Sequence, residues 1–244
     1  MKSSFIFVLL LLFAGVSNAY VLGSGKWGAP TPGTGAVITW SLMGTGTSCK
    51  TECTSDGSVG SFTAPSNFMP SGFKTQLERA FDAWSNVANL TFIEKTDNNE
   101  DFDTVPSSSD IRIGGHALDG IGSTLAHAFF PPPNRVSAAG DVHFDVAEHW
   151  KIGFGGSGVD IFQVFVHELG HALGLSHTNV PNSLMNSIYS ESFSGPQADD
   201  IAGMQFLYGT AITEPAANPV PLPSSLFLLI SGMISLRFFK SKIA

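Results

Sequence analysis

Basic residues are scarce in this sequence of 244 residues, in which 12 lysines and arginines stand against 20 aspartates and glutamates. Four of the basic residues lie in the two terminal segments: Lys2, Arg237, Lys240 and Lys242. All 20 acidic residues lie between Tyr20 and Pro219, so this middle part carries a formal charge of −12 from 8 basic and 20 acidic side chains. Such a balance argues against binding of nucleic acid or of an anionic lipid surface by the middle part itself.

Cysteine is rarer still. The chain has two, Cys49 and Cys53, in a stretch rich in glycine, serine and threonine from about residue 44 to residue 71. In an oxidising compartment so close a pair favours a small disulfide loop, which would stabilise the fold only modestly.

Long apolar runs occur only near the two ends of the sequence. Residues 1–19 have a lone Lys2, an apolar stretch from Phe5 to Val16 and small residues before Tyr20, which is the layout of a cleaved signal peptide. From this layout we expect export of the chain. A buried first helix or a retained anchor is the alternative.

The second apolar run, from Leu222 to Phe239, follows a linker rich in proline and alanine at 210–219 and ends among basic residues. It is short for a membrane span, although its basic end suits the cytoplasmic side of a membrane. With the residues Val220-Pro221-Leu222-Pro223 ahead of it, the segment 220–244 resembles the PEP-CTERM sorting tail of Gram-negative bacteria, although Leu222 replaces the usual glutamate. The resemblance implies processing by an exosortase; an ordinary membrane anchor is the alternative.

The most informative motif is His-Glu-Leu-Gly-His-Ala-Leu-Gly-Leu-Ser-His at residues 167–177. On a helix, His167 and His171 share one face and can bind one metal ion, while Gly174 can end the helix and let His177 reach the same ion. Three imidazoles suit a zinc ion that keeps its fourth position for water, as catalytic sites do. Glu168 is the candidate general base for hydrolysis of a peptide bond. The alternative is an amphipathic helix with half-buried histidines.

This motif resembles the metzincin signature of zinc proteases. Met185, eight residues after His177, fits the methionine turn that metzincins place beneath the zinc. Position 187 is serine, where astacin-like and serralysin-like relatives have a tyrosine and matrixins usually have proline. Tyr189 instead stands where matrixins use a tyrosine in the wall of the S1′ pocket, so the resemblance is closest to the matrixins.

Segments upstream of the motif also resemble matrixins. Residues 119–129 resemble a calcium-binding turn that leads into the edge strand beside the cleft, and residues 141–148 resemble a segment that supplies calcium carboxylates. The resemblance implies that Leu125 and Ala126 hold an extended substrate. It also implies calcium ligands, which we expect to be Asp119, Gly120, Gly122, Asp145 and Glu148. A solvated surface turn is the alternative for these acids.

The resemblance further implies a structural zinc ion with three histidines and an aspartate. His127 and His143 match two of these ligands, and His116 is the candidate third. His116 lies only three residues before Asp119, so the family's intervening loop is shortened and no acidic residue remains between them. We therefore expect one tightly held zinc per chain and a weaker second site. An ordinary surface histidine is the alternative for His116.

Many animal matrixins are kept inactive by a propeptide cysteine bound to the zinc. Neither Cys49 nor Cys53 has the arginine- and proline-containing context of such a switch, and no propeptide-length segment separates Tyr20 from the first expected strand at 36–42. We therefore expect these two cysteines to form a disulfide and not to bind the zinc.

The sequence predicts an α+β fold for a matrixin-like domain at residues 20–209, with a twisted, mostly parallel sheet, an edge strand at the cleft, an active-site helix and a C-terminal helix. Expected strands lie at 36–42, 90–95, 111–114, 125–130 and 142–144, and expected helices at 71–89, 160–173 and within 199–209.

The function expected from these features is that of an exported zinc endopeptidase, secreted or displayed at the cell surface or extracellular matrix of a Gram-negative bacterium and acting on protein substrates. The alternatives are a non-catalytic surface or biofilm-matrix protein that keeps the fold, and an enzyme of another metzincin branch.

Overall fold

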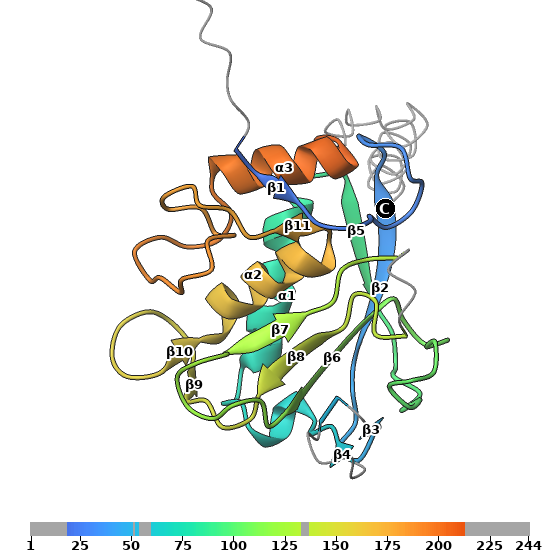
Figure 1. Ribbon diagram of the computed structural model, residues 1–244, viewed down its shortest axis with the longest axis vertical. Coiled ribbons are helices and arrows are strands. Elements are labelled where there is room, and N and C mark those ends of the chain that lie inside the picture. The colour runs from blue at the N-terminus through green and yellow to red at the C-terminus, as the bar shows by residue number, and fades with distance from the viewer. Residues whose placement is uncertain (1–18, 51, 54–59, 133–136, 213–244) are drawn as a thin grey trace, which may run out of the picture. The chain divides into compact units, whose positions relative to one another are not determined.

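The computed structural model describes residues 19–50, 52–53, 60–132 and 137–212 (Figure 1). Residues 1–18 of the expected signal peptide and the expected sorting tail lie outside these ranges, and the described core belongs to a unit that ends at Ala211. Within these ranges, no helix has both the length and the apolar character needed to cross a membrane.

A five-stranded sheet forms the centre of the fold. Its strands, in spatial order, are β5 (Leu90–Glu94), β2 (Ala36–Leu42), β6 (Ile111–His116), β8 (Val142–Asp145) and β7 (Ala126–Ala128). The first four strands run parallel to their neighbours, whereas β7 runs antiparallel along β8 at the edge of the sheet. The predicted mostly parallel α+β sheet with an edge strand is thus confirmed.

The helices are η1 (Pro65–Asn67), α1 (Phe73–Ser85), α2 (Ile161–Ala172) and α3 (Ala198–Tyr208). Helix α1 buries Leu77, Phe81 and Trp84, which recur at helical spacing. It packs against α2, where the indole nitrogen of Trp84 donates a hydrogen bond to the carbonyl of Val166 over 3.0 Å. Figure 1 shows α1 passing behind α2 and β7, with α3 near the top of the view.

Three short strand pairs complete the described structure. They are β1 (Val21–Leu22) with β11 (Leu175–Ser176), β3 (Ser48–Lys50) with β4 (Gly60–Ser61), and β9 (Trp150–Lys151) with β10 (Val159–Asp160). The sequence analysis predicted none of these pairs, because strands this short leave no apolar periodicity to read.

The two faces of β8 look into two different apolar clusters, as the alternation of side chains along a strand requires. Val142 and Phe144 belong to the main core beneath α1 and α2. His143, between them, is in ring contact with Phe62 and Phe102 of a smaller cluster on the other side, which also contains Cys49. The sheet therefore separates the main core from a second, smaller buried region.

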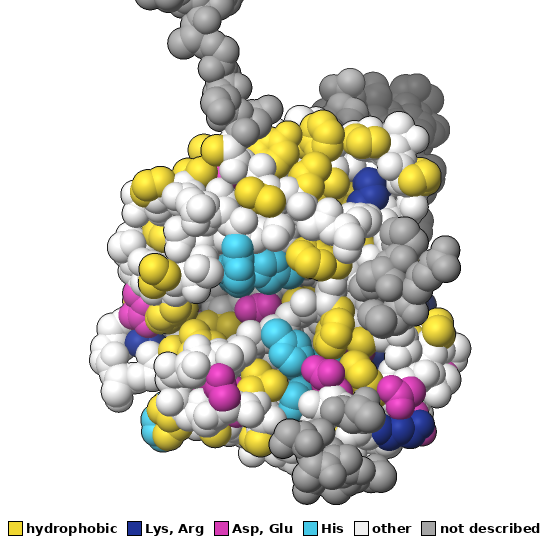
Figure 2. Space-filling model, in the orientation of Figure 1, with side chains coloured by type: hydrophobic (Ala, Val, Ile, Leu, Met, Phe, Trp, Pro, Cys, Tyr) yellow, Lys and Arg dark blue, Asp and Glu magenta, His cyan; other side chains and the backbone are white. Residues whose placement is uncertain are grey.

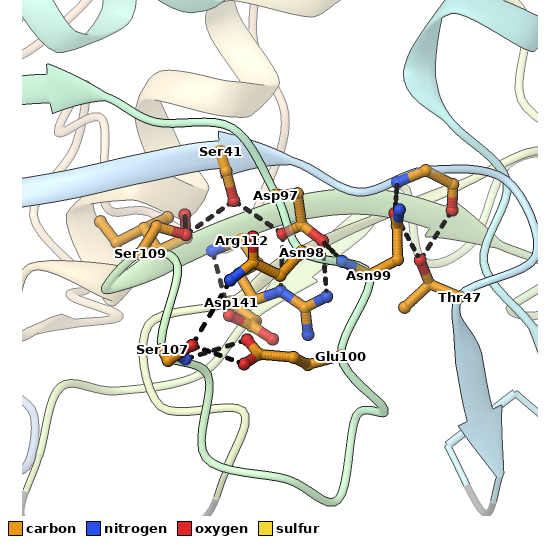
Figure 3. Close-up of polar contacts among 12 residues, drawn as sticks. Ser41, Thr47, Asp97, Asn98, Asn99, Glu100, Ser107, Ser109, Arg112 and Asp141 are labelled. Atoms are coloured by element: carbon orange, nitrogen blue, oxygen red, sulfur yellow. Dashed lines mark hydrogen bonds and ion pairs between the residues drawn. The ribbon is translucent and has the colours of Figure 1, made fainter.

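A buried ion pair ties the acidic loop after β5 to β6 (Figure 3). The guanidinium of Arg112 donates to both carboxylate oxygens of Asp97, over 2.8 and 2.9 Å, and Ser41 donates to the same carboxylate over 2.8 Å. The side chains of Arg112 and Asp97 are only 1% and 3% exposed. The backbone N–H of Arg112 donates to the carboxylate of Asp141 over 3.0 Å.

Candidate active site

The three histidines of the 167–177 motif converge on one point. His167 and His171 lie one turn apart on α2, and His177 follows β11. The chain reverses at Gly174, whose φ of 106° is readily adopted only by glycine. The Nε2 atom of His177 lies 3.2 Å from that of His167 and 3.1 Å from that of His171.

The surrounding carbonyl groups determine which ring nitrogen carries the proton. Nδ1 of His167 lies 2.7 Å from the carbonyl oxygen of Leu184, and Nδ1 of His171 lies 2.8 Å from that of Leu175. Because a carbonyl only accepts, each Nδ1 must donate, which leaves a lone pair on each Nε2. Converging lone pairs repel one another without a cation. A tetrahedral zinc ion with Zn–N bonds of about 2.0–2.1 Å would separate its ligand nitrogens by roughly 3.3 Å, so this donor set fits zinc.

Burial prepares these imidazoles for a metal. It lowers the pKa of His167 to about 4 and that of His171 to about 3, and it lowers the pKa of His177 as well. All three rings are therefore neutral near pH 7, which is the form that binds metal.

Glu168 lies beside the histidines and lines the cleft, with only 7% of its surface exposed. Burial raises the pKa of its carboxyl to about 8. A nearby cation would favour the ionised form and lower that pKa. The position suits a group that accepts and then returns a proton.

The cleft is a cavity of about 600 Å³ between α2, the edge strand β7 and the segment from Leu184 to Phe193. Leu125, Ala126 and Tyr189 line it, at the positions expected for substrate contacts. Figure 2 shows histidine side chains in a hollow across this face of the molecule. One side of β7 pairs with β8, and its other side borders the cavity.

Hydrogen bonds fix the wall of the cleft around Tyr189. Its hydroxyl accepts from the backbone N–H of Asp160, the N-cap of α2, over 2.8 Å and donates to Glu191 over 2.6 Å. Glu191 also forms an ion pair with Lys151 at 2.8 Å. Burial and the bond to Glu191 raise the pKa of Tyr189, so the hydroxyl stays protonated. The sequence analysis identified Tyr189 but neither Glu191 nor Lys151.

Met185 packs against Gly170 of α2 and is 2% exposed. Its carbonyl accepts from the backbone N–H of Thr178 over 3.0 Å. The carboxylate of Asp200, on α3, accepts from the backbone N–H groups of Leu184 and Met185 over 2.7 and 3.0 Å and also from the hydroxyl of Ser183. Sequence reasoning had assigned no role to Asp200.

The expected calcium ligands Asp145 and Glu148 contact the turn that contains Asp119, Gly120 and Gly122. The carboxylate of Asp145 accepts from the N–H groups of Asp119 and Gly120 over 3.3 and 3.0 Å, and Glu148 accepts from the N–H of Gly122. Asp119 itself accepts from the hydroxyl of a neighbouring threonine over 2.7 Å. Their calcium-binding role stays a prediction.

A second metal-binding arrangement contains His116, His127 and His143, the three candidates for a structural zinc. The structure adds a fourth member, Glu52, which the sequence analysis missed. Glu52 directly precedes Cys53, and the structure joins Cys53 to Cys49 in a disulfide. Only the fold brings Glu52 to these histidines, because no sequence spacing links it to them.

The fold and the cleft with its three histidines agree with the expected matrixin-like domain. Residues 61–209 match the family model of the matrixins, and the chain belongs to the matrixin family, whose members depend on zinc and calcium. The resemblance first read from the 167–177 motif is thereby confirmed at the level of the family.

Several matrix metalloproteinases are similar to this chain. Matrix metalloproteinase-25 of Mus musculus is 38% identical over 169 residues, which is 66% of this chain and 27% of the relative. Matrix metalloproteinase-16 of Homo sapiens is 40% identical over 157 residues, or 59% of this chain and 25% of the relative. Macrophage metalloelastase of Rattus norvegicus is 40% identical over 158 residues, or 62% and 32%. The chain thus spans about a quarter to a third of the length of these relatives.

Proposed function

We propose that this chain is an exported zinc endopeptidase, in which His167, His171 and His177 hold the catalytic metal and Glu168 is the general base. The observation that carries the proposal is the convergence of the three Nε2 atoms beside a buried glutamate. When bound, the zinc ion would lower the pKa of a water molecule to roughly 7 and polarise the carbonyl of the substrate.

Glu168 would take a proton from the attacking water as its oxygen bonds to the carbonyl carbon. The C–N bond of the peptide then breaks, and Glu168 returns the proton to the departing amine. Burial favours this exchange, because a carboxylate that is poorly solvated holds a proton more readily than one in water. The carboxyl therefore acts as base in the first step and as acid in the second.

The substrate would lie along β7 in an extended conformation. A strand at the edge of a sheet can pair through its backbone with an extended peptide, and β7 borders the cavity on the side away from β8. Leu125 and Ala126 flank this path, and Tyr189 forms part of the opposite wall. The calcium turn with Asp119, Asp145 and Glu148 would hold the chain that leads into β7.

The test is cleavage of an unstructured protein by the purified full-length chain. We expect cleavage at internal peptide bonds, its loss after treatment with a zinc chelator, and its recovery when zinc is restored. A chain that binds the substrate without cleaving it, with zinc present in the protein, would instead support the non-catalytic alternative.

The expected signal peptide at 1–19 and the PEP-CTERM-like tail at 220–244 lead to a further part of this proposal. The protein would reach the envelope or the outside of a Gram-negative cell, and an exosortase would process the tail. A chain shortened by residues 219–244 should then be released into the medium. Equal fractionation of the full-length and shortened chains would contradict this part without affecting the peptidase mechanism.

A further inference from the structure

The second histidine cluster is built on three adjacent strands, away from the main core. His127 in β7 and His143 in β8 are direct cross-strand partners. Gly114 in β6 is the partner of His143 on its other side, so His116, two residues further along β6, points to the same face. Because Gly114 has no side chain, Met43 and Phe62 pack directly over it.

The ring nitrogens of the cluster point at one another. Nε2 of His127 lies 3.0 Å from Nδ1 of His143. Nδ1 of His116 lies 3.0 Å from the carbonyl of Ala117 and must donate to it, which leaves a lone pair on Nε2. That Nε2 atom is buried and has no hydrogen-bond partner in the part of the chain that the structure describes. This unsatisfied acceptor belongs to a residue only 4% exposed, and its lone pair is available to bind a cation.

The carboxylate of Glu52 completes the cluster. Its Oε1 atom lies 3.2 Å from Nε2 of His127 and 4.0 Å from Nδ1 of His143. The four ligand atoms of Glu52, His116, His127 and His143 all lie within 4.8 Å of one another. Three imidazoles and one carboxylate are a full donor set for a closed tetrahedral zinc site.

We propose that Glu52 is the fourth ligand of a second zinc site with His116, His127 and His143, and that the Cys49–Cys53 disulfide holds it in place. This inference goes beyond the peptidase proposal, since Glu52, His116 and His143 do not line the cleft. With Glu52 as a ligand, the second zinc site is no longer expected to lack an acidic ligand. That expectation considered only the shortened loop between His116 and Asp119.

A simple ion pair between Glu52 and a protonated His127 does not explain the cluster. Such a pair leaves Nε2 of His116 buried and unsatisfied. It also places a cationic ring 3.0 Å from a nitrogen of His143, which is fully buried and contacts Phe62, Phe102 and other aromatic rings. A metal ion satisfies all of these groups at once. Behind it, Nε2 of His143 lies 4.0 Å from the carboxylate of Asp141, which is beyond hydrogen-bonding distance.

The disulfide fixes Glu52 from both sides. Cys49 belongs to β3 and is fully buried in the small apolar cluster, so it is a rigid anchor. The backbone N–H of Glu52 donates to the carbonyl of Cys49 over 2.9 Å, and Glu52 is bonded directly to Cys53, whose Cα lies 5.6 Å from that of Cys49. Cutting the disulfide frees one side of this attachment, which should lower the probability that the carboxylate faces the metal.

The experiment measures zinc release from the full-length chain to a colour-forming chelator. We expect two zinc ions per chain in the wild type, released in two phases. In Glu52→Gln the phase of the second zinc should be at least about tenfold faster, as expected when a metal loses a ligand or its support. Asp101→Asn is the matched control, because it removes a negative charge that pairs with Lys50 near the same loop but contacts no histidine of the cluster.

The disulfide is tested by treating the folded proteins with a phosphine reductant, which contains no thiol. Reduced wild type should release the second zinc about tenfold faster, while reduction should add little in Glu52→Gln, because both changes act through one ligand. The zinc of the cleft should be released at the same rate in every sample. A single zinc in the wild type, or unchanged release in Glu52→Gln, would overturn the ligand assignment. Release unaffected by reduction would overturn the role of the disulfide.

Discussion

Gly170 on α2 and Met185 are in direct contact. A Cβ atom built on Gly170 would overlap the sulfur of Met185 and approach the indole ring of Trp84 to 3.3 Å. The helix that carries His167 and His171 can therefore pack this closely on the methionine turn only because position 170 has no side chain.

Gly170→Ala should accordingly destabilise the protein even though alanine is the better helix former. We expect a loss of about 1–3 kcal/mol in the free energy of unfolding, because Met185 must move in a packed core. Urea unfolding measures this directly. Thr75→Ala is the control, because it raises helix propensity at an exposed position of α1. Unchanged or increased stability of Gly170→Ala would show that the contact is not constraining.

Asp200 should position the methionine turn, since its carboxylate accepts from Ser183, Leu184 and Met185. Asp200→Asn replaces one accepting oxygen by a donor and removes the charge. We expect a loss of about 1–3 kcal/mol of stability, since buried N–H groups lose their acceptor, together with lower peptidase activity. Asp82→Asn on α1 is the control. Full activity and stability in Asp200→Asn would contradict this role.

The buried pair of Arg112 and Asp97 should make stability depend on pH in the acid range. Burial alone would raise the pKa of Asp97, but hydrogen bonds from Arg112 and Ser41 outweigh it, so the pKa lies below its usual value. A carboxyl whose pKa is lower in the folded state stabilises the fold above the unfolded value of about 3.9. That contribution is lost as the pH falls through the lower, folded value.

Asp97→Asn should therefore cost about 3–5 kcal/mol at pH 7, because it leaves Arg112 buried without its partner. The difference from the wild type should shrink as the pH falls below about 4. Urea unfolding of both proteins at several pH values, with metal removed from each, measures the difference. A gap that stays constant down to pH 2 would contradict the assigned pKa.

Tyr189→Phe should loosen the wall of the cleft while keeping its ring. The change removes the hydrogen bonds to Asp160 and Glu191 but leaves the histidines and Glu168 untouched. We expect KM for a peptide substrate to rise several-fold with a smaller change in kcat, the pattern for lost binding and intact chemistry. A fall in kcat at constant KM would place the hydroxyl in the chemical step instead.

The sequence predicted the large elements closely because their signals are local. The apolar spacing from Phe73 to Val87 predicted a helix at 71–89, and α1 occupies 73–85; the strand expected at 36–42 coincides with β2. The helix expected at 160–173 is α2, which Asp160 caps by accepting from the N–H of Gln163 over 2.8 Å. The strand expected at 125–130 is shorter, because only residues 126–128 pair with β8.

The candidate site was predictable where its residues are close in sequence and not where the fold assembles them. His167, Glu168 and His171 share a helix, so their spacing alone places them together. Glu52 reaches His116 only through the β3 hairpin and the sheet, and Asp200 reaches Met185 only through the packing of α3. One sequence without structure contains no signal for such contacts.

The most direct test of the account is the zinc content and peptidase activity of Glu168→Ala, measured on the same preparation. The histidines hold the metal and Glu168 handles the proton, so we expect zinc retained as in the wild type and turnover of an unstructured protein lowered by about 10²- to 10⁴-fold. Undiminished turnover in a zinc-loaded Glu168→Ala protein would contradict the mechanism.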